Sequence, residues 1–356
     1  MQHSEIEMHF ITFYKRNYSR SGNLLTGLTQ LGINTRFSEI SGGIRLSIKE
    51  IFALVSTSNK NSIFVVMSPS HVLTLYLKFA RAKFIILDAG WSLTEAEISR
   101  GPVRRIPQIF KAVIVDSISF MCATMILVES AQQKKFLSKK FFLKENKLIV
   151  SLTGANESEL RIRPEEPREL AGLPPEIGIV LFRGKINREA GIRNIIRFGI
   201  SLEAHGYILV LATPNLDSSI VIPPNIITIE RWIPQPEINY LYQKSTLVIG
   251  QLGSIPRQNR TIPHKYFEAM YFHKPYYSTL TKSLEEVSDG GNGIIEPDIR
   301  IGHMTQDHLT SFIEDDLLLK VKGVEAGNVW KSETNSKQIA LNLLKQESIK
   351  KIIHQR

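Results

Sequence analysis

The residues with the clearest chemical character lie in the segment 260–270. Pro263 precedes His264 and Lys265, and Glu268 stands three residues after the lysine. Proline is favoured in the first turn of a helix, where its missing N–H would have no partner anyway. A helix N-terminus offers free N–H groups and positive dipole character to an anion. Because Lys265 and Glu268 share a helix face at this spacing, the pattern suits a nucleotide, with the cation on its phosphates and the carboxylate on its ribose hydroxyls. A surface ion pair would give the same spacing.

A second candidate is the polar loop 183–191, which follows an apolar run and leads into a helical pattern. It contains Gly184, Lys185 and Arg188. The alternative interpretation is a solvated basic loop.

Asp88 directly follows the apolar run 84–87, and Gly90 lies two residues further on. A carboxylate at the C-terminal end of a strand is a candidate acceptor-binding group or general base. A capping aspartate explains the same position equally well.

These groups are positioned by apolar runs that alternate with helical patterns, which is typical of parallel sheets covered on both faces. We therefore predict an α/β protein of two doubly wound, Rossmann-like domains that face each other across a cleft. The domains span 1–165 and 166–330, and the Pro-, Glu- and Arg-rich stretch 161–176 has the composition of a linker. The expected strands are 8–13, 33–37, 63–67, 84–87, 125–128 and 148–150 in the first domain, and 177–182, 208–211, 226–229, 246–249, 275–277 and 293–295 in the second.

The composition is that of a globular protein. The chain has 356 residues, 43% of them hydrophobic and 22% charged. No apolar run reaches the roughly 20 residues that span a bilayer, and the first residues do not resemble a secretory signal. A single cysteine, Cys122, and the lack of a Cys/His cluster with zinc spacing fit a cytoplasmic protein without a structural metal.

The positive charge is concentrated in the first half. Residues 1–165 hold 22 Lys and Arg against 13 Asp and Glu, whereas residues 166–356 hold 22 against 21. The densest stretch, 134–147, interleaves lysines with Phe and Leu. Such a pattern favours peripheral contact with an anionic membrane surface, although a solvated helix face would look the same. No nucleic-acid-binding module accompanies the charge, so we do not expect a nucleic-acid partner.

The segment around Glu268 resembles the nucleotide-sugar site of GT-B glycosyltransferases of glycosyltransferase family 4. That family carries a glutamate, seven residues, and a second glutamate followed by Ala-Met and a Gly/Lys-Pro turn. Here Glu268 is followed by Ala269-Met270 and Lys274-Pro275, but position 260 holds Arg260 instead of the first glutamate. The resemblance implies that Arg260 lies at the reaction centre.

The loop 183–191 is similar to the family's pattern in which two cations hold the donor diphosphate. Lys185 matches the first cation, the second position is Ala190, and Arg188 at the helix start is our preferred replacement, with Arg183 as the other candidate. Trp232-Ile233 resembles the family's segment that contacts the nucleotide base.

On the acceptor side, residues 1–160, the resemblance to the family lies in the order of strands and helices and not in specific motifs. It places Arg16, Arg20 and Gly22 in the loop after the first strand, and Asn156 in the turn before the linker. It also implies that the C-terminal segment 331–356 forms a helix that packs back on the first domain.

The implied function is transfer of a sugar from a nucleoside diphosphate sugar to a glycan or lipid-linked acceptor, with retention and without a metal or other cofactor. Asp88 and Arg260 are the catalytic candidates. Arg260, Ala190 and the lack of a histidine before Asp88 also suit a catalytically inactive GT-B protein that acts as a binding or scaffold subunit. A sugar-nucleotide epimerase of the same fold is a third hypothesis.

Overall fold

The structure is a computed structural model, and it describes residues 7–13, 19–41, 44–59, 61–99, 106–214, 216–297 and 312–354. The chain forms two compact units. The first comprises Met1–Asn156 together with Asn335–Arg356, and the second comprises Glu157–Thr334. No helix in the described ranges is long and apolar enough to cross a lipid bilayer.

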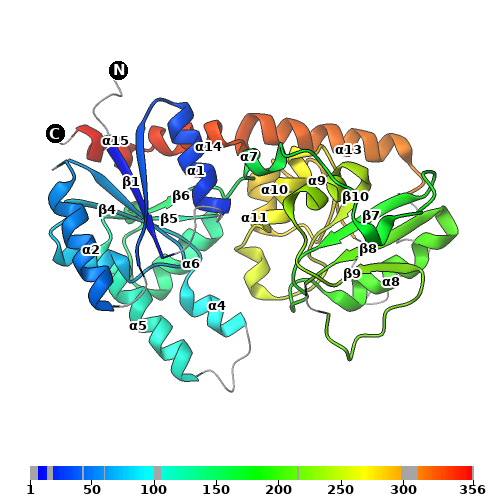
Figure 1. Ribbon diagram of the computed structural model, residues 1–356, viewed down its shortest axis with the longest axis horizontal. Coiled ribbons are helices and arrows are strands. Elements are labelled where there is room, and N and C mark those ends of the chain that lie inside the picture. The colour runs from blue at the N-terminus through cyan, green and yellow to red at the C-terminus, as the bar shows by residue number, and fades with distance from the viewer. Residues whose placement is uncertain are drawn as a thin grey trace. The chain divides into compact units, whose positions relative to one another are not determined.

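The first unit is built on six parallel strands in the order β2-β1-β3-β4-β5-β6 (Figure 1). Strands β1, β3, β4 and β5 are buried along their whole length because helices cover both faces of the sheet, which explains the uninterrupted apolar sequences of β3 and β5. The strands are β1 (Glu7–Thr12), β2 (Asn34–Glu39), β3 (Ile63–Met67), β4 (Phe84–Gly90), β5 (Met125–Val128) and β6 (Leu148–Val150).

The helices of the first unit include two from the end of the chain. They are α1 (Ser19–Gln30), α2 (Ile44–Thr57), α3 (Leu73–Phe79), α4 (Leu93–Ser99), α5 (Ile106–Cys122), α6 (Ala131–Lys140), α14 (Ser336–Lys345) and α15 (Glu347–His354). The resemblance implied one helix over 331–356, but α14 ends at Lys345, Gln346 is extended, and α15 begins at Glu347.

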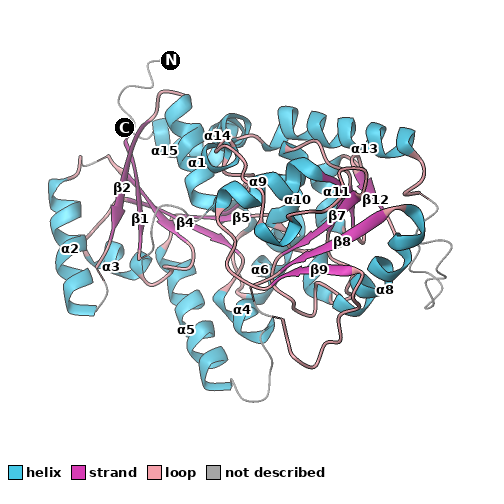
Figure 2. Cartoon of the chain, turned by 45° about the vertical axis from the view of Figure 1, so that its right-hand side comes forward, coloured by secondary structure: helices cyan, strands magenta, loops and turns pink. Residues whose placement is uncertain are grey.

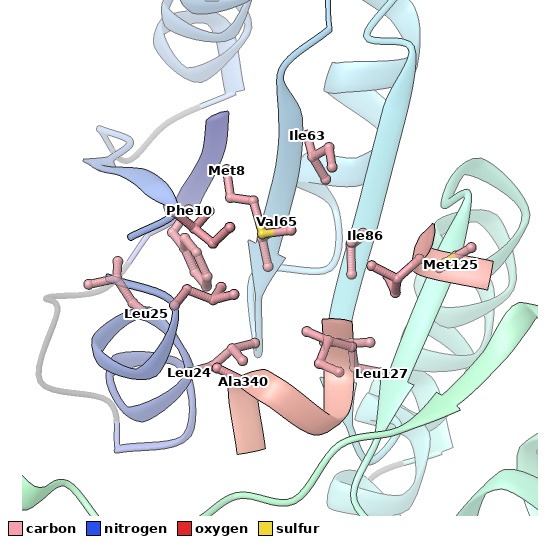
Figure 3. Close-up of a cluster of buried hydrophobic side chains, with 14 of the residues drawn as sticks. Met8, Phe10, Leu24, Leu25, Ile63, Val65, Ile86, Met125, Leu127 and Ala340 are labelled. Atoms are coloured by element: carbon pink, nitrogen blue, oxygen red, sulfur yellow. The ribbon is translucent and has the colours of Figure 1, made fainter. Parts of the chain in front are cut away.

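Helix α14 packs closely on α1. A Cβ atom on Gly27 would lie 1.9 Å from the backbone oxygen of Ser336, so the contact requires glycine. Side chains from the sheet, from α1 and from α14 share one buried cluster (Figure 3), which includes Met8, Phe10, Leu24, Leu25, Val65, Ile86, Leu127 and Ala340. The C-terminal helices are therefore part of the first unit's hydrophobic core.

The second unit repeats the architecture, with six parallel strands in the order β12-β11-β10-β7-β8-β9 and helices on the sheet faces (Figure 2). Its strands are β7 (Gly178–Arg183), β8 (Tyr207–Ala212), β9 (Ile226–Ile229), β10 (Ser245–Ile249), β11 (Tyr276–Tyr277) and β12 (Ile294–Ile295). Its main helices are α8 (Ile192–Leu202), α9 (Gln235–Lys244), α10 (His264–Tyr271), α11 (Lys282–Ser288) and α13 (Asp316–Val329). The predicted α/β class with two doubly wound sheets is confirmed.

The proline-rich segment with linker composition is bound to the second unit. Asn239 donates hydrogen bonds of 2.9 Å to the carbonyl oxygens of Glu159 and Ile162. Arg231 donates to both carboxylate oxygens of Glu169 at 2.8 and 2.9 Å. These charge-assisted bonds to Arg231 lower the pKa of Glu169 to about 2, so the carboxylate stays ionised at neutral pH.

Candidate functional site

The second sheet brings two loops together at its C-terminal edge, the edge at which parallel α/β sheets bind ligands. Loop 184–191 follows β7, and loop 250–263 follows β10. The N–H of Leu252 donates to the Ala190 oxygen at 3.0 Å, and the N–H of Gly253 donates to the Glu189 oxygen at 3.1 Å. A Cβ atom on Gly191, which has φ 69°, would lie 2.4 Å from the Leu252 carbonyl carbon. Only glycine permits this backbone approach.

Glu268 of α10 is the centre of a buried polar network. Its side chain is almost fully buried, and one carboxylate oxygen accepts hydrogen bonds from Arg183 and, at 2.6 Å, from the Tyr242 hydroxyl. The other oxygen lies 3.3 Å from Nδ1 of His264. Burial alone would raise the pKa of Glu268, but Arg183 and His264 with Tyr242 hold it well below its usual range. Glu268 is therefore an anion at neutral pH, and both its oxygens have protein partners.

Lys265 is the most buried cation of the predicted donor set, and it forms no ion pair with the described residues. Its ammonium lies 3.9 Å from the centre of the Phe182 ring. Among the described residues, none forms a hydrogen bond or an ion pair with it. Burial, assisted by the positive charge of Arg183 and opposed by Glu268, lowers the pKa of Lys265 to about 7. An anion that supplied oxygen atoms to this ammonium would stabilise the protonated form.

Two backbone features surround the Lys265 ammonium. Gly184 has φ 138°, and a Cβ atom there would lie 3.6 Å from Nζ of Lys265, so the glycine keeps this side of the cation open. Pro263 caps α10 without a side-chain hydrogen bond, and the N–H of Tyr266 donates to the Pro263 oxygen at 2.9 Å, so the N–H groups of His264 and Lys265 are those of the first turn that can meet an anion. A cation, a glycine and a helix N-terminus are the features that favour an anion.

The remaining predicted donor residues lie around this site with more exposure. Lys185 and Arg188 are exposed, and Arg260, at the end of the short helix Pro256–Asn259, donates to the Pro256 oxygen at 3.2 Å. The prediction that Arg188 begins a helix is wrong, because residues 184–191 form the loop and α8 begins at Ile192. Ala190, at the position of the family's second cation, is buried in the core of the second unit.

Trp232 and Ile233 follow β9 at the same sheet edge. The Trp232 side chain is 81% exposed, whereas Ile233 is partly buried. Packing in the core therefore does not explain this tryptophan. A base-contacting role for the segment stays a prediction.

The first unit holds a second buried cluster, at the C-terminal edge of its own sheet. Asp88 is 1% exposed, and its carboxylate accepts a 2.6 Å hydrogen bond from Nε of Arg20 in α1. Arg20 also donates to the Thr153 hydroxyl at 3.0 Å. Asp88 thus has a close cationic partner, which favours a positioning role over that of a free general base. Its catalytic role stays a prediction.

The other acceptor-side residues are only partly located. Gly22 is buried in α1, and its oxygen accepts a bond of 2.8 Å from the Thr26 hydroxyl. Asn156 is partly buried at the end of the first unit. Arg16 lies outside the described residues. Among those described, no group of three or more His, Cys, Asp or Glu side chains is placed to hold a metal ion.

The two units are Rossmann-like domains of the GT-B type. No family profile matches the chain, and no curated protein sequence matches it. Solved structures do match its fold. Sucrose-phosphate synthase from Thermosynechococcus elongatus superimposes with a TM-score of 0.67 at 11% identity, covering 95% of this chain and 97% of that one. Anabaena HepE in complex with UDP-glucose gives a TM-score of 0.65 at 9% identity, covering 95% of this chain and 98% of that chain.

A putative UDP-N-acetylglucosamine 2-epimerase from Listeria monocytogenes gives a TM-score of 0.60 at 12% identity, covering 98% of this chain and 97% of that chain. At these identities the similarity concerns the fold, and the matching structures include both a synthase and a putative epimerase. The particular chemistry of this chain must therefore be argued from its own residues.

Proposed function

We propose that this protein is a glycosyltransferase that binds a nucleoside diphosphate sugar in its second unit and transfers the sugar to a glycan or lipid-linked acceptor. The observation that carries the proposal is the Lys265 ammonium, held without a counter-ion beside Gly184 at the N-terminus of α10. A diphosphate supplies the oxygen atoms that this cation lacks. The family 4 resemblance of the segment around Glu268, and the UDP-glucose complex of HepE, support a donor of this kind.

Within this proposal, fixed cations stabilise the charge that develops on the departing diphosphate. Lys265 is the innermost, while Lys185, Arg188 and Arg260 lie further out. Transfer with retention and without a metal remains part of the proposal, on resemblance to family 4. So does peripheral contact with an anionic membrane at the cytoplasmic face, which the excess of basic residues in the first half supports.

Glu268 binds Arg183, Tyr242 and His264. A ribose hydroxyl can reach it only by sharing or replacing one of these partners. We therefore propose that Glu268 acts first by holding Arg183 and α10 in place, and contacts the ribose when donor binding rearranges this network.

A catalytically inactive GT-B subunit is the second candidate, and two observations favour it. Arg260 reverses the charge expected near the donor sugar, and Asp88 is ion-paired with Arg20. Such a protein would bind the donor through Lys265 but neither hydrolyse nor transfer it.

The first experiment is a thermal shift series with UDP, UDP-glucose, UDP-N-acetylglucosamine and GDP-mannose, since a ligand that binds the folded state raises the melting temperature with concentration. We expect a shift with at least one ligand, abolished by Lys265→Met and retained by Lys320→Met, an exposed lysine on α13. If no ligand shifts the wild type, or if both variants respond equally, donor binding at Lys265 is refuted.

The second experiment separates the functions. Release of nucleoside diphosphate from the bound donor supports a transferase, and an epimerised sugar nucleotide with the diphosphate intact supports an epimerase. Binding without either product supports the inactive subunit.

A further inference from the structure

Helix α5 carries an apolar stripe on its exposed face. Ile106, Phe110, Ile114 and Met121 are 67%, 66%, 43% and 68% exposed. With 3.6 residues per turn, these four positions fall within an arc of about 80° and extend over about 23 Å of helix. The opposite side of α5 is buried in the first unit through Ala112, Asp116, Ser119 and Phe120. The stripe is therefore an apolar face that does not contribute to the core, and it lies on a helix at the outside of the unit (Figure 1).

The stripe ends among other exposed apolar side chains. Phe142, in the turn after α6, is 95% exposed, and Phe79 at the end of α3 is 67% exposed. The turn that bears Phe142 lies beside the end of α5, because the Phe141 and Phe120 rings are 4.9 Å apart. Since α3, α5 and α6 end where the next parallel strand begins, this group lies at the N-terminal edge of the sheet, away from Asp88.

Two lysines lie at this end of α5, and the neighbouring segments carry further basic residues. Nζ of Lys147 donates to the Met121 oxygen at 3.2 Å. Burial raises the pKa of the Cys122 thiol while Lys78 and Lys147 oppose the shift, so both ammonium groups lie close to the end of the helix. The segments 73–83, 106–122 and 131–147 hold ten Lys and Arg, against two acidic residues, of which one, Asp116, is buried. The basic residues are Lys78, Arg81, Lys83, Lys111, Lys134, Lys135, Lys139, Lys140, Lys144 and Lys147.

We propose that this face docks the first unit on an anionic lipid surface, with the α5 stripe and Phe142 inserted at the interface and the lysines on the headgroups. Lipid supplies both requirements at once, an apolar phase and negative charge. A second copy of the chain would bring the same positive charge to the contact, which disfavours a symmetric dimer. The inference rests on the membrane contact in the proposed function and names the surface that makes it. Because this surface lies in the first unit and the donor residues lie in the second, vesicle binding and donor binding can be lost separately.

The test is sedimentation of the full chain with vesicles of phosphatidylcholine alone, or of equal parts phosphatidylcholine and phosphatidylglycerol, without any donor. We expect binding to the anionic vesicles only, weakened by salt. Phe110→Ser and Phe142→Ser should each lower the partition coefficient about tenfold, which is about 1.4 kcal/mol. The matched control is Leu317→Ser, because Leu317 on α13 of the second unit is 72% exposed, and it should leave binding unchanged. All three positions are exposed, and thermal melts verify that the variants fold.

Three results would overturn the inference. The first is no binding to anionic vesicles. The second is equal binding by wild type and both Phe variants, which would leave charge alone as the cause. The third is a wild-type dimer in sedimentation velocity that Phe110→Ser dissociates, which would assign the face to a second copy. Donor binding, measured in the same preparations, should be unaffected by either Phe variant.

Discussion

Replacing Lys265 should abolish a pH dependence of donor binding that the wild-type protein shows above neutrality. The Lys265 ammonium sits over the Phe182 ring and beside Arg183, and this environment lowers its pKa to about 7. A diphosphate oxygen within hydrogen-bonding distance favours the charged form and raises the pKa again. Donor binding is then linked to the uptake of a proton by Lys265.

The magnitude follows from the fraction of Lys265 that is protonated before binding. With a pKa of about 7, that fraction is about one half at pH 7 and about one hundredth at pH 9. If only the protonated form binds well, the apparent dissociation constant rises by about 50-fold between these pH values. Truncation to methionine removes a charge-assisted hydrogen bond worth about 1.5–3 kcal/mol, which weakens binding about 10- to 100-fold at pH 7.

The assay is isothermal titration calorimetry with UDP-glucose, or with whichever donor stabilises the protein, at pH 7, 8 and 9. Such a donor has no phosphate group that titrates near neutrality. Lys265→Arg is the informative control, because a guanidinium remains charged across this range and should bind with little pH dependence. Lys265→Met should bind weakly, also with little pH dependence. Titrations in buffers of different ionisation enthalpy should reveal about one proton taken up per donor at pH 8 and 9.

The reasoning would be refuted by a wild-type affinity that stays constant from pH 7 to pH 9. It would also be refuted if Lys265→Met kept the wild-type pH profile, since another group would then be titrating. A loss of affinity in Lys265→Arg alone would indicate a steric requirement for lysine, not a titration.

Three further predictions concern stability. The pKa of Lys265 is about 7 in the folded protein and 10.5 in its ordinary state, so between these pH values the unfolded chain binds more protons at Lys265 than the folded one. The protein without donor therefore gains stability as the pH rises through this window. Lys265→Met should raise the melting temperature at pH 7 by a few degrees, measured by calorimetry. Glu268→Gln leaves Arg183 without its counter-ion and should cost about 2–3 kcal/mol in urea unfolding. Gly27→Ala should cost about 1–3 kcal/mol, since its Cβ would overlap the Ser336 oxygen, whereas this change in an exposed helix stabilises.

Strands were the part of the fold most accessible from sequence, because the signal for a buried parallel strand is local. The apolar runs 63–67 and 226–229 coincide with β3 and β9. Helix boundaries were less accessible. Residues 188–191 continue the pattern of α8, but the left-handed Gly191 and the bonds of 189 and 190 to the neighbouring loop hold them out of the helix.

The site was only half accessible, for a physical reason. Lys265 and Glu268 lie in one segment whose pattern indicates an anion site. The partners of Glu268 lie outside that segment, since Arg183 and Tyr242 are 85 and 26 positions away in the sequence. No periodicity links such residues, so Arg183 could be considered only as a phosphate ligand. Likewise the exposure of Trp232 depends on which side chains surround it, and the sequence around it does not specify them.

The distribution of charge in the second unit separates donor binding from catalysis. Arg183 neutralises Glu268 inside the protein, which leaves Lys265 as the cation that a ligand must satisfy. In the proposed function, Lys265 is the residue that binds the diphosphate, and its environment suits that role. The proposed catalytic residues are Arg260, whose charge is opposite to that in family 4, and Asp88, whose carboxylate is already engaged with Arg20. A protein that has kept donor binding but lost transfer would have this combination, and so would an enzyme that stabilises the leaving diphosphate with an additional guanidinium. Arg260→Gln distinguishes the two. In an active enzyme the change lowers turnover and leaves donor binding in place, whereas in an inactive protein there is no turnover to lower.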